Sequence, residues 1–189
     1  MANWASTSYR IEGKKEDLQE VYDLYIAFEK GKRDTYNGKT DKGWEGNIVW
    51  ALGGDLDKYY LRGFIEPCEL SDDLLSIEAE EAWGASDFRH FLESHYEGMK
   101  VYYIVEEGGC EVYATIDAEG RYFSYRYMVN SCINGDDEWE YFNTEQEALQ
   151  HIANRLELDS ITIEQLAVWQ ENHEDEDDYI CFNEYKIVA

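Results

Sequence analysis

Residues 3–12 read NWASTSYRIE, and two kinds of position alternate along the whole stretch. One set is Trp4, Ser6, Ser8 and Arg10, and the other is Ala5, Thr7, Tyr9 and Ile11. A period of two places successive side chains on opposite faces of a strand. The stretch therefore predicts a β-strand that ends at Gly13.

The residues that follow Gly13 change the period from two to three and four. The apolar positions are Leu18, Val21, Tyr22, Tyr25 and Phe28. Acidic residues occupy the first turn and Gly31 follows the last apolar position, as is typical of a helix start and stop. We expect one amphipathic helix here.

The middle of the chain contains several strand-like runs. We expect strands at about 44–52, 59–65 and 74–83, and a helix that begins after Ser86. Glycines and Asp separate three further runs, at 100–105, 110–116 and 121–129, which predict an antiparallel meander. Tyrosines along those runs favour cross-strand packing over base stacking, because few basic residues accompany them.

The last third of the chain predicts a short strand at 139–142, two helices and a final strand around 180–188. Thr144 with Glu147 and Thr162 with Gln165 have the spacing of capping boxes at the helix starts. Two passes of strand, helix and strand followed by a β-rich tail indicate an α+β fold with a largely antiparallel sheet and helices on one face.

Charge is the clearest compositional feature. The 189 residues contain 16 Lys and Arg against 42 Asp and Glu, a formal charge of −26, and residues 44–189 hold eight of the basic and 34 of the acidic residues. Nucleic acids and anionic membranes repel such a surface, so neither is an expected direct partner. A basic protein is the favoured partner. No signal-like or membrane-length apolar run is present, so we expect a cytoplasmic protein.

Two segments resemble the YubB-type ferredoxin-like domain family of plasmid- and phage-associated bacterial proteins. One is the opening MANW with its strand and Gly13, and the other runs from Leu75 through Ala82 and Trp83, a helix and residues 101–105 to the turn at Glu106. Ala5 replaces the family's usual Cys, and Glu107 stands where Pro is common. The resemblance covers residues 1 to about 130. It implies a ferredoxin-like core and a mobile-element context, with no cluster and no catalytic residues.

We therefore expect a single domain over 1–189, with a core at 1–130 and an extension at 131–189 packed on it. No Cys, His or carboxylate spacing typical of a metal, cluster, nucleotide or nucleophile site occurs, which predicts neither a cofactor nor catalysis. His90 and His151 are expected on exposed helix surfaces. The candidate interaction surface is acidic and aromatic: Glu78, Glu80, Glu81, Trp83, Glu174, Asp175, Glu176, Asp177 and Asp178.

The composition and this surface favour a non-enzymatic acidic binding module of a bacterial mobile element. One alternative is a DNA mimic that inhibits a host DNA-binding protein. The total charge of the chain is comparable to that of a DNA duplex as long as the folded protein is wide. The other is an enzyme or metal-binding protein of unrecognised type. Rows of carboxylates at phosphate-like spacing would favour the mimic.

Overall fold

The computed structural model describes residues 3–173 and 177–188, and the chain divides into two compact units, residues 1–116 and 117–189. Both units combine helices with β-sheet, which confirms the predicted α+β class. The first unit ends 14 residues before the expected core boundary at 130. The single domain over 1–189, with the extension packed on the core, stays a prediction.

The described part of the first unit, residues 3–116, contains five strands and three α-helices. Short 3-10 turns occur at Tyr36–Gly38, Leu56–Lys58 and Gly108–Cys110. In chain order the main elements are β1 (Trp4–Glu12), α1 (Lys15–Glu29), α2 (Gly46–Ala51), β2 (Gly63–Ser71), β3 (Leu74–Ala82), α3 (Phe88–His95), β4 (Lys100–Glu107) and β5 (Val112–Thr115).

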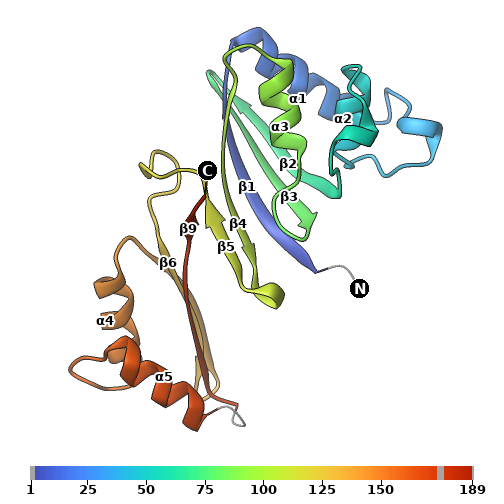
Figure 1. The fold of residues 1–189 in the computed structure, drawn as a ribbon. Coiled ribbons are helices and arrows are strands. Elements are labelled where there is room, and N and C mark those ends of the chain that lie inside the picture. The colour runs from blue at the N-terminus through green and yellow to red at the C-terminus, as the bar shows by residue number, and fades with distance from the viewer. Residues whose placement is uncertain (1–2, 174–176, 189) are drawn as a thin grey trace. The chain divides into compact units, whose positions relative to one another are not determined.

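These five strands lie in the order β2-β3-β1-β4-β5, and every neighbouring pair is antiparallel. The three helices gather on one side of the sheet (Figure 1). Ala5, Tyr9 and Ile11 of β1 face them and are buried, as the alternation of residues 3–12 predicts. Leu18 and Val21 of α1 complete this part of the core, which fixes the helix-covered face of the sheet.

The predicted strand at 44–52 is wrong, because residues 46–51 form the short helix α2. Ile48 and Val49 are buried in the first core, so tertiary packing outweighs the strand preference of this run. An isolated bridge joins Trp44 to Phe64 and places the start of α2 against β2. This attachment positions Glu45, whose backbone N–H donates to the Gly63 carbonyl of β2.

The second unit has its own sheet and its own core. Its elements are β6 (Tyr127–Ile133), β7 (Asp136–Phe142), α4 (Glu145–Arg155), α5 (Ile163–Asn172), β8 (Tyr179–Glu184) and β9 (Lys186–Ile187). Three of these strands pair in the order β7-β6-β8, antiparallel throughout. Helices α4 and α5 lie on the same side of this sheet (Figure 1). Val129, Ile152 and Leu166 are among the residues buried between them.

Both predicted capping boxes are confirmed, at Thr144 with Glu147 and at Thr162 with Gln165. The predicted meander is wrong in its third strand. Residues 100–107 and 112–115 pair as β4 and β5, but β6 pairs with β7 and β8 in the second sheet. Asp117 causes the break, because its carboxylate accepts backbone hydrogen bonds from residues 121, 122 and 123 and closes a loop there.

Candidate functional site

The predicted interaction residues do not gather into one surface. Glu78 and Glu80 share the face of β3 away from the helices, as expected, where Glu78 pairs with Arg10 at 2.9 Å and accepts a hydrogen bond from Ser8. Trp83 lies in the turn after β3 and is 51% exposed. Asp177 is exposed and Asp178 is half-buried ahead of β8. Glu174, Asp175 and Glu176 lie outside the described residues.

The prediction that Glu81 belongs to an interaction surface is wrong, because Glu81 is fully buried. It continues the buried alternation of Leu75, Ile77 and Ala79 along β3 and so points toward the helices. The Tyr9 hydroxyl donates to both of its carboxylate oxygens at 2.8 Å. Glu81 is therefore part of the core of the first unit and not of an interaction surface.

A second buried carboxylate, Glu45, converges on the same place. Its backbone N–H donates to the Gly63 carbonyl at 3.2 Å, and Gly63 lies opposite Glu81 in the β2–β3 register. A Cβ atom on Gly63 would lie 2.7 Å from Glu45 Oε2 and 2.8 Å from Glu81 Cγ. Ser86 donates to Glu45 Oε2 at 2.8 Å. We call Glu45 and Glu81 the buried carboxylate pair.

The electrostatics of this pair favour a bound proton. Burial and the neighbouring Glu81 charge raise the pKa of Glu45 well above its usual value, which favours the protonated form of the Glu45 carboxyl in the folded chain. Burial and then the two carboxylates raise the pKa of Tyr9, which keeps its hydroxyl as the donor to Glu81. Only 1% of Glu45 and 0% of Glu81 is exposed, so a substrate in solution has no access to the pair.

Other reactive groups of the described chain lie apart from this pair. A hollow of about 620 Å³ between α1 and β2 is lined by Tyr25, Glu29, Asp41, Lys42, Gly43, Phe64, Ile65, Glu66 and Pro67. Burial raises the pKa of the Cys68 thiol to about 12, so this cysteine is a core residue and not a nucleophile. Within residues 3–173 and 177–188, no three His, Cys, Asp or Glu side chains are arranged to hold a metal ion.

The second unit carries the denser charge. Its 73 residues include four Lys and Arg (Arg121, Arg126, Arg155 and Lys186) against 18 Asp and Glu, a net −14. The Arg126 guanidinium donates hydrogen bonds within the loop before β6, to the carbonyls of Asp117, Phe123 and Tyr125. Few cations therefore remain to offset the acidic surface of this unit.

One face of the second sheet is not covered by α4 and α5. Val129 of β6, Phe142 of β7 and Ile180 of β8 point toward the helices, so the alternate positions point the other way. Trp139, Tyr141 and Tyr179 there are 50%, 41% and 40% exposed. This helix-free face consists of Met128, which is buried, and of Asn130, Cys132, Asp137, Trp139, Tyr141, Tyr179, Cys181 and Asn183, with no Lys or Arg among them.

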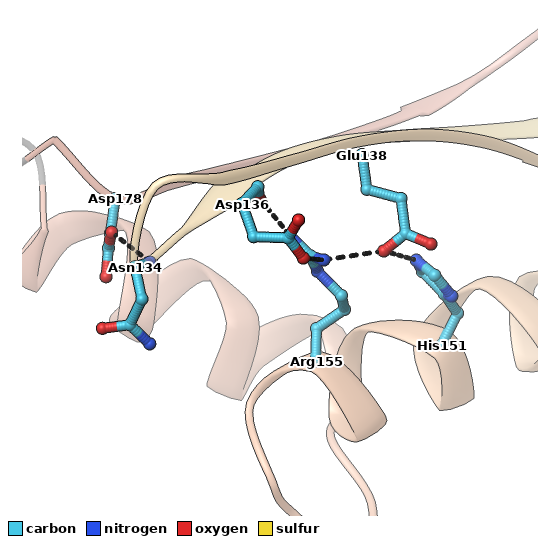
Figure 2. Close-up of polar contacts among 6 residues, drawn as sticks. All are labelled: Asn134, Asp136, Glu138, His151, Arg155 and Asp178. Atoms are coloured by element: carbon cyan, nitrogen blue, oxygen red, sulfur yellow. Dashed lines mark hydrogen bonds and ion pairs between the residues drawn. The ribbon is translucent and has the colours of Figure 1, made fainter.

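On the opposite face, α4 is tied to β7 by ion pairs (Figure 2). Arg155 Nη1 lies 2.6 Å from Asp136 Oδ2 and 2.8 Å from Glu138 Oε2, and Nη2 donates to the Asp136 carbonyl. His151 Nε2 lies 3.7 Å from Glu138 Oε2, with its ring 5.0 Å from the Phe142 ring. His151 is thus half-buried and not exposed as expected. These contacts hold the edge strand β7 in place.

Arg155→Ala should lower the free energy of unfolding by about 1–3 kcal/mol, because it leaves Asp136 and Glu138 close together without their cation. This loss of stability is smaller than the loss expected for a fully buried ion pair, because both carboxylates are partly exposed. Urea unfolding measures the change. The control is Lys58→Ala, which removes the exposed ion pair of Lys58 Nζ with Asp55 Oδ2 at 3.7 Å. This variant should change stability little. Equal effects would contradict the structural role of Arg155.

Comparisons with known proteins found no relative of this chain. No family model matches it, and neither curated proteins nor solved structures provide a match. Among residues 3–173 and 177–188, no helix combines the length and apolar character that a bilayer crossing requires. The charge of the second unit and its helix-free face are therefore the features that bear on function.

Proposed function

We propose that this chain is a non-enzymatic, cytoplasmic binding module that recognises a basic protein through its second unit. The observation that carries the proposal is the charge of that unit, 18 acidic against four basic residues, together with an aromatic sheet face that has no Lys or Arg. Charge of one sign speeds encounter with an oppositely charged partner. Exposed aromatic side chains supply the contact area that holds it.

We also propose that the first unit is a ferredoxin-like core, as the resemblance to the YubB-type family implies. Support comes from the order β2-β3-β1-β4 and from the sequence of elements, in which α1 precedes the β2–β3 hairpin and α3 follows it. That resemblance also implies a bacterial mobile-element context, and we propose a host protein as the partner. Function itself still depends on the site and not on the fold.

Basic proteins of the host include those that bind DNA, and their grooves would suit this charge. Full mimicry of duplex DNA calls for rows of unpaired carboxylates. The longest acidic row on β7 is Asp136, Glu138 and Glu140, and Arg155 already pairs with the first two. This pairing favours recognition of a basic surface by charge and aromatic contact over imitation of a phosphate backbone.

The test compares two double variants that each remove two negative charges. Asp137→Asn with Glu140→Gln alters the second unit, and Asp72→Asn with Asp73→Asn alters an exposed turn of the first. The immobilised full chain is exposed to the heparin-binding proteins of a bacterial lysate, and a retained protein is identified, purified and bound again. We expect the second-unit variant to bind it more weakly than the first-unit variant.

Two results would contradict the proposal. One is equal binding by both double variants, because the charge of the second unit would then have no special part. The other is retention of the same proteins by an unrelated acidic protein of equal net charge, because the interaction would then be unspecific. Loss of binding at about 0.5 M salt is expected, since exposed charges are screened over a few ångströms there.

A further inference from the structure

We infer that the helix-free face of the second sheet is a docking surface for arginine side chains of the partner, with Trp139 as the stacking platform and Asp137 as the carboxylate. This inference rests on the proposed function and names the part of the second unit that makes the contact. It follows from the register of β6, β7 and β8, which brings an exposed indole, a phenol and a carboxylate onto one face.

The geometry of these three groups is set by the backbone. Asp137 and Trp139 are alternate residues of β7, so their Cα atoms lie about 7 Å apart on the same face. Asn130 lies opposite Trp139, and Cys132 lies opposite both Asp137 and Tyr179. A guanidinium that lies over the indole of Trp139 is therefore within reach of the Asp137 carboxylate.

Contacts within the sheet hold this site in shape. The Tyr179 hydroxyl lies 3.3 Å from Asn130 Oδ1 and 3.5 Å from Asp137 Oδ1, which places its ring across Cys132 and beside the carboxylate. A carboxylate accepts about four hydrogen bonds. The Tyr179 hydroxyl and the Cys132 thiol each make one contact with this carboxylate, so Asp137 keeps acceptor capacity for about two donors of a guanidinium.

Charge and chemistry select arginine over other occupants. Arginine stacks on aromatic rings, forks onto a carboxylate and loses less hydration than lysine. A purely apolar partner would bury Asp137 without a counter-charge, which is costly. A second copy of this chain would bring another unit of net −14 against the first, so charge repulsion opposes self-association.

The experiment titrates the full chain with nona-arginine and with nona-lysine, two peptides of equal charge, and measures both dissociation constants by calorimetry. The wild type should bind nona-arginine at least about threefold more tightly. Trp139→Ala should abolish this preference. Trp83→Ala is the matched control, because Trp83 is 51% exposed and Trp139 is 50% exposed, and it should keep the preference.

Asp137→Asn keeps the shape of the face and should weaken nona-arginine binding more than nona-lysine binding, so the test does not depend on Trp139→Ala folding normally. The inference is overturned if the wild type has no preference for nona-arginine, if Trp139→Ala keeps it, or if sedimentation shows that the face joins two copies of the chain. Salt-sensitive binding of both peptides without an effect of Trp139 would leave the proposed function standing. Binding of neither peptide would overturn both.

Discussion

Glu45→Gln should raise the free energy of unfolding at pH 7 by about 1–3 kcal/mol and flatten its dependence on pH. The amide has the shape of the protonated carboxyl and still accepts the Ser86 hydrogen bond. It cannot ionise, so the cost of a second charge beside Glu81 disappears. Because Glu45 is buried in the folded chain, we expect this effect to depend clearly on pH.

The direction follows from proton linkage. The pKa of Glu45 is raised on folding, so the folded chain binds this proton more tightly than the unfolded chain. The stability that it contributes is complete below the unfolded value of about 4.3 and is lost as the pH rises through the folded value, by up to about 1.4 kcal/mol per pH unit.

Urea unfolding at pH 5, 6, 7 and 8 measures the slope. Glu80→Gln serves as the control, because Glu80 is an exposed carboxylate one position from Glu81 on β3 and should leave the slope close to that of the wild type. A Glu45→Gln variant with the wild-type slope would show that Glu45 is not the proton-binding group, and the description of the buried carboxylate pair would fall.

Gly63→Ala should lower the free energy of unfolding by about 1–3 kcal/mol or more. The added methyl group would lie 2.7 Å from Glu45 Oε2 and 2.8 Å from Glu81 Cγ. Both side chains are buried, so neither can move into solvent to relieve the clash. Thermal or urea unfolding measures the loss at a pH where Glu45 remains protonated.

Gly108→Ala is the matched control for this substitution, since its nearest neighbour would be the Tyr113 hydroxyl oxygen at an ordinary 3.6 Å. We expect Gly108→Ala to change stability by less than about 0.5 kcal/mol. Equal free energies of unfolding for the two alanine variants would show that the side chains of Glu45 and Glu81 do not pack against Gly63.

Local sequence signals predicted the parts of the fold that depend on neighbouring residues. The alternation of residues 3–12 and the two capping boxes are of this kind, because each involves side chains within a few positions of one another. The helix α2 was missed because its residues favour strands, while its burial against the first core depends on distant contacts.

The buried carboxylate pair shows both what the sequence contained and what it lacked. Glu81 follows Leu75, Ile77 and Ala79 at the same alternating positions, which is a signal that this carboxylate points into the core. Nothing nearby in the sequence identifies Glu45 as its neighbour, because 36 residues separate the two. The helix-free face was missed for the same reason, since β8 joins β6 from about 50 residues further along the chain.

The salt dependence of binding shows whether the partner's cations contact the second unit. The logarithm of the dissociation constant for the purified basic partner is plotted against the logarithm of salt concentration for the wild type and the two double variants. We expect a shallower slope for Asp137→Asn with Glu140→Gln than for Asp72→Asn with Asp73→Asn, because the partner's cations contact the second unit. Equal slopes for the two variants would contradict it.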